Sequence, residues 1–206
     1  PFPCMFVDSH CHLSFPELQQ QLSAIREAMQ AARVDRALCI CTTLEEFEQV
    51  HALATAYDNF WATAGVHPHH ASEYTAESDA EMRDLHTHAE VVAVGECGLD
   101  YFRDFSPRPA QRKAFERQLQ IAVDLAVDGV GKPLFLHQRD AHDDFVAMMK
   151  NFDGRLGPAV VHCFTGTKKE LFDCLDQDWH IGITGWLCDE RRGLHLRELV
   201  KNIPAN

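Results

Sequence analysis

The chain has 206 residues, of which 46% are hydrophobic and 24% are charged, and its formal net charge at pH 7 is −12. This length and composition are typical of one globular domain and exclude a disordered or fibrous protein. The acidity argues against a protein that coats nucleic acid non-specifically, because binding to phosphates favours a basic surface. A site whose bound cations supply positive charge could still act on phosphate.

The sequence also bears on the compartment. No apolar run approaches the roughly 18 residues that cross a bilayer. The first residues, PFPCMF, lack the basic start and the long apolar stretch of a signal peptide. The eight cysteines are scattered without a CxxC pair, which argues against a disulfide framework or a zinc ribbon. We therefore expect a cytoplasmic protein that contacts no membrane and requires no protein partner.

Short apolar runs alternate with longer amphipathic runs along the whole chain. The expected strands are 5–9, 36–42, 60–65, 91–95, 133–137, 158–162 and 180–184. The expected helices are 17–33, 44–57, 77–89, 109–128, 141–150, 168–177 and 190–201. This alternation is typical of repeated β/α units around a parallel sheet. No change of composition marks a second domain, so residues 1–206 are predicted to form one domain.

Local signals support several helix boundaries. Thr167, with Glu170 three residues later, has the spacing of a capping box. Pro109 suits the first turn of a helix. The glycines and the proline of VDGVGKP, residues 127–133, are expected to end that helix before the next strand.

Alternating β/α units form either an open doubly wound sheet or a closed (β/α)8 barrel. An open nucleotide-binding sheet usually has a glycine-rich turn after an early strand, and neither GxGxxG nor GxxxxGK followed by Ser or Thr occurs here. In a barrel, functional side chains instead lie at the C-terminal ends of several strands. The positions of the polar residues described next favour the α/β class with a TIM-type barrel.

Five metal-competent side chains directly follow four of the apolar runs: His10, His12, Glu96, His137 and His162. Because alternate strand residues share a face, His10 and His12 are both expected to enter the barrel mouth, with Cys11 pointing toward the helices. Imidazoles that converge with a carboxylate suit Zn²⁺ or Mn²⁺, and additional oxygen ligands would admit Mg²⁺. Any one of these histidines could simply follow a strand, but the joint pattern predicts a site for a divalent metal.

Other polar residues near strand ends have two interpretations each. His67 is expected to contact the substrate or support the metal ligands, whereas His69 and His70 are expected on the surface beyond Pro68. Arg139 could bind a phosphate or pair with a neighbouring aspartate.

Two further positions are equally open. Asp100 could orient a metal-bound water or cap a loop. Arg191 and Arg192 could contact phosphate, although the start of a solvated helix is the favoured interpretation. The remaining histidines receive no functional assignment: His51, His86, His88, His142, His180 and His195.

The blocks VDSHCHL, AGVHPHH, VVAVGECGLDY, KPLFLHQRDAH, VVHCFTGT and IGITGWLCDERRG together resemble the TatD-type metal-dependent deoxyribonucleases of the amidohydrolase superfamily. They run through almost the whole chain. The resemblance implies a (β/α) barrel that binds one or two divalent cations, most often Mg²⁺, with Mn²⁺ or Zn²⁺ as alternatives. It also implies hydrolysis of DNA, with 3′-to-5′ exonuclease action on single strands.

The resemblance further implies roles for the five candidate ligands. It implies that His10 and His12 bind a first metal, that Glu96 bridges two metals, and that His137 and His162 bind the second. Two such cations would hold the scissile phosphate and activate a water.

Three residues are the catalytic candidates. Glu96 is the principal one, and His67 and Arg139 are further candidates. The family continues into an eighth strand with an ETDAP-like segment, whose aspartate is a metal ligand and general base, whereas this sequence stops at Asn206. We therefore expect a barrel truncated at its C-terminus to about seven β/α units.

The sequence is also compatible with functions other than DNA hydrolysis. A chain that lacks the last unit could be a fragment of a longer enzyme, or a weakly active or inactive metal-binding protein. The same superfamily architecture also serves the hydrolysis of small amide, ester and lactone substrates.

Overall fold

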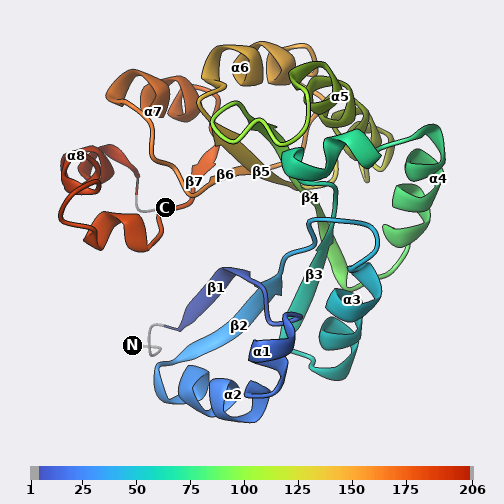
Figure 1. Cartoon of the computed structure of the whole chain (residues 1–206), viewed down its shortest axis with the longest axis vertical. Coiled ribbons are helices and arrows are strands. Elements are labelled where there is room, and N and C mark those ends of the chain that lie inside the picture. Colours follow the sequence, from blue (N-terminus) through green and yellow to red (C-terminus); the bar gives the residue numbers. More distant parts are fainter. Residues whose placement is uncertain (1–4, 205–206) are drawn as a thin grey trace.

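The computed structural model describes residues 5–204, and Cys4, one of the eight cysteines, lies outside this range. Seven parallel strands form one sheet in sequence order. They are β1 Phe6–Cys11, β2 Val34–Cys39, β3 Phe60–Ala64, β4 Val91–Asp100, β5 Leu134–Arg139, β6 Ala159–His162 and β7 His180–Ile181. Figure 1 shows that the sheet curls and that the helices lie on its outer side. The predicted barrel-type fold with about seven β/α units is confirmed.

The helices follow the strands as expected. The α-helices are α1 Pro16–Gln19, α2 Leu22–Ala31, α3 Phe47–Ala56, α4 Ala76–Leu85, α5 Arg108–Asp124, α6 His142–Lys150, α7 Lys168–Leu175 and α8 Leu194–Leu199. Short 3-10 helices are η1 Pro68–Glu73, η2 Gly185–Cys188 and η3 Val200–Asn202. Within residues 5–204, no helix combines the length and the apolar character needed to cross a membrane.

Several predicted helices differ from the structure. The helices expected over 77–89 and 109–128 end earlier, at Leu85 and Asp124. The helix expected over 17–33 is interrupted between α1 and α2, where Gln21 adopts φ −111° and ψ 10° and its side-chain amide donates to the Glu17 carbonyl. The helix expected over 190–201 begins later, at Leu194, because Asp189 first accepts the backbone N–H groups of Arg191 and Arg192 in a turn.

The main core lies between the sheet and the helices. The rings of Phe115 on α5 and Phe145 on α6 stack with centroids 5.4 Å apart and pack against Leu134 and Leu136 of β5. Burying a side chain of this size contributes about 1.5–3 kcal/mol. A smaller cluster around Phe135 fills the inner side of the sheet. Its ring lies beneath the polar residues described below, and therefore gives them a rigid apolar floor.

Strand β4 continues well past its predicted end at residue 95. Gly98 has φ +146° and pairs with His137 of β5, and a Cβ at this position would collide with the His137 carbonyl oxygen. The glycine therefore permits close approach of the two strands instead of ending β4. As a result, Glu96 lies within a strand, at an irregularity of the β4–β5 pairing between Val94 and Cys97, and its backbone N–H donates to the Cys41 carbonyl at 2.9 Å.

Candidate metal centre

Glu96 lies at the centre of the polar cluster on the inner side of the sheet. The residue is only 4% exposed. Its Oε2 lies 3.2 Å from Nε2 of His10 on β1, and its Oε1 lies 3.1 Å from Nδ1 of His137 on β5. The two oxygens of one buried carboxylate therefore contact imidazoles from two other strands.

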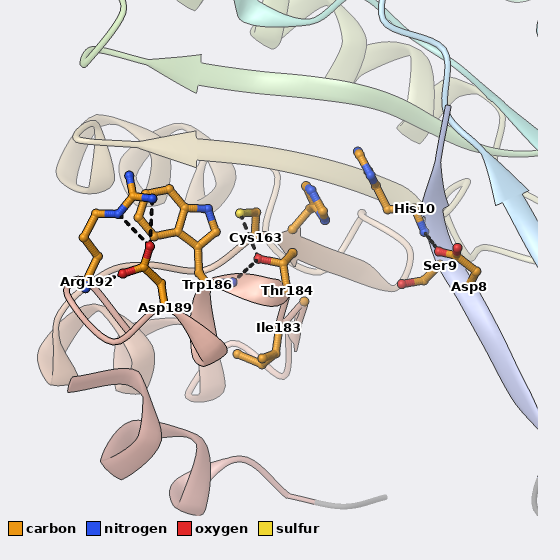
Figure 2. A pocket seen from close by; sticks show the side chains of 12 residues that line it. Asp8, Ser9, His10, Cys163, Ile183, Thr184, Trp186, Asp189 and Arg192 are labelled. Atoms are coloured by element: carbon orange, nitrogen blue, oxygen red, sulfur yellow. Dashed lines mark hydrogen bonds and ion pairs between the residues drawn. The ribbon is translucent and has the colours of Figure 1, made fainter. Parts of the chain in front are cut away.

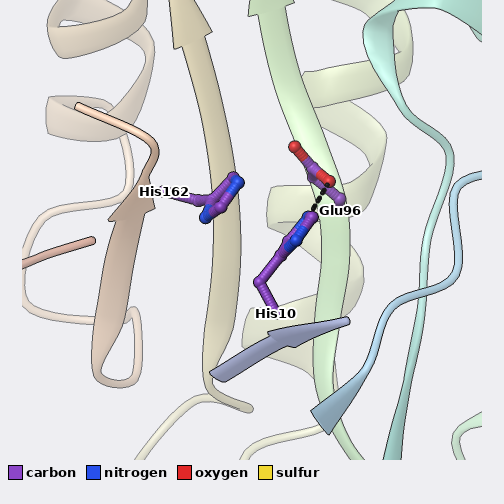
Figure 3. Close-up of side chains that lie close together, drawn as sticks. All are labelled: His10, Glu96 and His162. Atoms are coloured by element: carbon purple, nitrogen blue, oxygen red, sulfur yellow. Dashed lines mark hydrogen bonds and ion pairs between the residues drawn. The ribbon is translucent and has the colours of Figure 1, made fainter. Parts of the chain in front are cut away.

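The first group of ligand atoms consists of His10, Glu96 and His162, all within 4.8 Å of one another (Figure 3). The rings of His10 and His162 are stacked, with centroids 3.8 Å apart and planes inclined by 7°. Phe135 lies beneath both rings, at 5.6 Å and 5.3 Å between centroids. These contacts hold the two imidazoles beside Oε2 of Glu96.

The second group consists of His67, Glu96 and His137, whose ligand atoms also lie within 4.8 Å of one another. The His67 ring centroid is 4.4 Å from that of His137. The grouping in space thus differs from the one that the resemblance implies, because His10 lies with His162 and His137 lies with His67.

His12 directly follows β1 and lies beside the first group. Its ring is perpendicular to that of His10, with centroids 4.7 Å apart, and it stacks on Phe15 at 4.9 Å. The His12 Nδ1 is buried and has no hydrogen-bond partner among residues 5–204. Cys11 packs with the apolar residues on the helix side of the sheet. His10 and His12 therefore lie together on the inner side, as the alternation of strand residues indicates.

Asp100 connects the second group to the following loop. Its Oδ2 accepts hydrogen bonds from Nε2 of His137 at 3.1 Å and from Nε2 of His69 at 2.9 Å. Its Oδ1 accepts the backbone N–H groups of Phe102 and Arg103. Asp100 therefore caps the loop, which is one of the two roles that the sequence suggested. It also orients His137.

The expected surface position of His69 is wrong. Its side chain is 28% exposed and contacts Asp100 at the edge of the second group. The reason is that η1 returns toward the sheet, and the Ser106 hydroxyl fixes it by donating to the His69 carbonyl and accepting the Ser72 N–H. Pro68 at the start of η1 predicted a turn after His67. A proline does not indicate whether the chain after the turn runs toward solvent or back toward the sheet.

The hydrogen bonds of His67 define its tautomer. Its Nδ1 accepts the backbone N–H of His69 at 3.1 Å. A neutral His67 must then carry its proton on Nε2. This Nε2 lies 3.6 Å from Oε1 of Glu96. His67 therefore presents an N–H donor toward the cluster in this arrangement and is better suited to contact an anionic oxygen than to bind a cation.

The cluster shifts the pKa values of its members in opposite directions. Burial favours protonation of Glu96, but hydrogen bonds with His10 and His137 outweigh it and hold the Glu96 pKa well below its ordinary value. Burial opposes the charge on His137, but hydrogen bonds to Asp100 and Glu96 raise its pKa to about 9. Burial and the neighbouring His10 lower the pKa of His162 to about 4. Glu96 is thus ionised, and His162 is neutral with a lone pair available, at pH 7.

A cavity of about 680 Å³ opens beside His10 and His162, between β1 and the segment after β7 (Figure 2). Arg192 lines it, forms a forked ion pair with Asp189, and lies 4.0 Å from the ring centroid of Trp186. Arg192 is thus held by Asp189 and Trp186 at the wall of the cavity, in the turn that precedes α8.

Arg139 is the last residue of β5 and therefore lies at the rim of the curled sheet. Its guanidinium carbon is 3.8 Å from the ring centroid of Phe102. Among residues 5–204 it forms no ion pair with Asp140 or Asp143. The aspartate pairing considered above is therefore absent from this part of the chain, and the guanidinium edge remains available at the rim.

The donor set fits a divalent cation. It combines imidazole nitrogens with a buried ionised carboxylate, a set typical of Zn²⁺ and Mn²⁺ sites. The Nδ1 of His12 has no hydrogen-bond partner among residues 5–204 and could bind an ion. Each oxygen of Glu96 lies beside a different group of histidines, so the cluster could hold one or two ions. The candidate groups therefore support a metal-dependent protein.

Comparison with known proteins agrees with this geometry. Residues 7–206 match the family model described as TatD related DNase. The chain is 46% identical over 199 residues to the 3′-5′ ssDNA/RNA exonuclease TatD of Enterobacter lignolyticus, covering 97% of this chain and 75% of that protein. It is 50% identical over 177 residues to the protein of the same name from Cronobacter turicensis, covering 86% of this chain and 65% of that protein.

A solved structure agrees as well. YJJV, a TatD homologue from Escherichia coli K12, superposes with a TM-score of 0.87 at 30% identity, over 98% of this chain and 76% of that one. The match to the family model, over residues 7–206, includes the strands that carry His10, Glu96, His137 and His162. The chain therefore belongs to the family of TatD-related DNases.

Proposed function

We propose that this protein is a metal-dependent nuclease that shortens single-stranded DNA from its 3′ end. The observation that carries the proposal is the position of Glu96, whose two oxygens each contact a separate group of histidines. The names of its relatives, which include single-stranded DNA and RNA as substrates and 3′-5′ as polarity, support it. The experiment described below therefore measures hydrolysis of RNA as well as of DNA.

The proposed ligands are His10, His12, Glu96, His137 and His162. A divalent cation held by them, with Mg²⁺ as the first candidate and Mn²⁺ or Zn²⁺ as alternatives, would supply Lewis-acid chemistry that polarises a phosphate and lowers the pKa of water. Glu96 contributes a fixed negative charge, and Asp100 keeps the His137 ring in one orientation. His67 presents its Nε2–H toward an oxygen of the scissile phosphate, and Arg139 neutralises charge at the rim.

Exposed aromatic side chains beside the cluster suit the bases of a single strand. Phe102 and Phe105, on the loop after β4, are 54% and 66% exposed. The Phe105 ring meets the ring of His69 edge-on, with centroids 4.8 Å apart. Stacking of bases on aromatic rings is the common mode by which proteins bind single strands. This loop would explain how an acidic chain binds DNA locally.

We also propose that residues 1–206 form one domain, because a single sheet runs from Phe6 to Ile181. The cytoplasm is the proposed compartment. Its support is the presence of free thiols such as Cys11 and Cys39, whose sulfurs lie 3.9 Å apart, which is typical of a reducing environment.

The test uses purified protein and a single-stranded DNA oligonucleotide labelled at its 5′ end, with Mg²⁺ or Mn²⁺. We expect a ladder of labelled products shortened from the 3′ end, and its loss when EDTA is added. A matching RNA oligonucleotide and a blunt duplex measure substrate preference. Metal uptake without shortened products, or hydrolysis of small esters without action on either oligonucleotide, would contradict the proposal.

A further inference from the structure

A second group of metal-competent side chains lies at the other end of the sheet. His51 belongs to α3, and His88 and Glu90 lie in the turn between α4 and β4. Their ligand atoms all lie within 4.8 Å of one another. Glu90 precedes the first residue of β4, six residues before Glu96, a separation of roughly 20 Å along an extended strand. This group is therefore separate from the candidate nuclease centre.

Two of the three side chains are already held in place. The His51 Nε2 lies 3.2 Å from the Glu90 Oε2. The ring of Phe47, one turn earlier on α3, stacks on His51 with centroids 5.3 Å apart and planes inclined by 12°. Tetrahedral zinc with bonds of about 2.0–2.1 Å separates its ligand atoms by roughly 3.3 Å. The His51 and Glu90 atoms therefore stand at the spacing that one ion requires.

The backbone of the turn is fixed as well. The Glu90 carbonyl accepts the Ala62 N–H at 2.9 Å, and the His88 carbonyl accepts the Val91 N–H at 3.1 Å. The His88 side chain is exposed, and its ring centroid is 4.3 Å from that of His51. A side-chain rotation of His88 is then sufficient to complete the set, because no backbone needs to move.

We propose that His51, His88 and Glu90 form a zinc site that links α3 to the turn before β4. Two imidazoles and one carboxylate favour zinc over magnesium, which prefers oxygen ligands. A surface hollow of about 620 Å³ adjoins both histidines and leaves room for water as the fourth ligand. Because the N-terminal ends of barrel strands contribute to stability and not to catalysis, we assign this ion a stabilising role, even though three protein ligands and a water are the coordination more usual for catalytic zinc.

The test counts zinc in chelator-stripped protein by titration against a chromophoric zinc chelator, together with the change in Tm. The variants are His88→Ala and, as an isosteric alternative, Glu90→Gln. His70→Ala is the matched control, because His70 lies 3.4 Å from Glu73 in an exposed pair that belongs to no three-residue group among residues 5–204. Circular dichroism verifies the fold of each variant.

We expect each folded site variant to bind about one zinc fewer per chain than the wild type and to lose the part of the zinc-induced rise in Tm that this site supplies. His70→Ala should behave as wild type, and millimolar Mg²⁺ should not displace the ion. Zinc at the nuclease centre is distinguished by Glu96→Gln, which should retain the zinc held by His51, His88 and Glu90. Wild-type zinc number and affinity in both folded site variants would overturn the proposal, whatever the nuclease assay shows.

Discussion

At the scale of single residues, Asp100 offers a test of how the histidines are positioned. Asp100→Asn keeps the size of the side chain but removes the charge that accepts hydrogen bonds from His137 and His69. Loss of such a supporting carboxylate weakens metal binding by about 10–100-fold. We expect the metal concentration that gives half-maximal nuclease activity to rise by that factor, with activity restored at high metal. The exposed Asp153→Asn is the control, and an unchanged metal requirement in Asp100→Asn would contradict this role.

A second residue links structure to pH. Burial raises the pKa of Tyr74 to about 12, and its hydroxyl donates to Asp79 at 2.8 Å. Since the unfolded phenol titrates near pH 10, the unfolded chain loses this proton first, and the free energy of unfolding falls as pH rises from 10 toward 12. Urea unfolding should show a smaller loss over this range in Tyr74→Phe than in the wild type. Parallel losses in the two proteins would show that Tyr74 does not contribute.

At the scale of elements, α7 has the capping box that its sequence predicted. The Thr167 hydroxyl accepts the Glu170 N–H, and the Glu170 carboxylate accepts the Thr167 N–H at 2.6 Å. Thr167→Ala should lower the free energy of unfolding by about 1 kcal/mol, the usual cost of losing such a cap. Thr55→Ala, an exposed substitution inside α3, should cost less or stabilise. Equal effects in urea unfolding would contradict the capping role.

The loop after β4 provides a second test at this scale. If bases stack on Phe105, then Phe105→Ala removes a contact worth about 1–3 kcal/mol per base. We expect KM for a single-stranded oligonucleotide to rise by about tenfold or more, with kcat little changed. The matched control is Phe172→Ala, another exposed phenylalanine with a nearby cation, Lys168. A fall in kcat without a change in KM would indicate that Phe105 supports the cluster instead.

Elements were predictable where local signals determine them. The alternation of apolar and amphipathic runs gave the order of strands and helices, and the capping box gave the start of α7. The extent of β4 was missed because glycine usually marks a loop, whereas Gly98 here allows contact with His137. The interruption between α1 and α2 has no proline or glycine to mark it. Such features depend on contacts between distant segments.

The same division applies to the candidate site. The five proposed ligands could be predicted from the sequence. His10 and His12 are spaced by two residues, and the other three follow apolar runs near strand ends. The partners of each histidine, however, depend on the curl of the sheet, which places His10 beside His162 instead of grouping it with His12 alone. His69 was misplaced because η1 turns back toward Asp100 through contacts with Ser106.

At the scale of the whole molecule, the curled sheet brings polar side chains from β1, β4, β5 and β6 to one inner surface. A net charge of −12 would repel DNA in general. Favourable contacts with DNA are confined to one region of the surface. This region contains the imidazoles around Glu96, Arg139 at the rim, and the loop with Phe102 and Phe105. The acidity of the chain and a nucleic-acid substrate are compatible on this basis.

The central claim is that Glu96 joins two groups of histidines into one metal-dependent nuclease centre. Its most direct test compares wild type, Glu96→Gln and the exposed control Glu116→Gln on a 5′-labelled single-stranded oligonucleotide with Mg²⁺ or Mn²⁺, with bound metal measured in parallel. We predict at least a roughly 100-fold loss of 3′ shortening in Glu96→Gln, together with reduced metal binding, and no loss in Glu116→Gln. Shortening by Glu96→Gln at the wild-type rate, or by the wild type in excess EDTA, would contradict the claim.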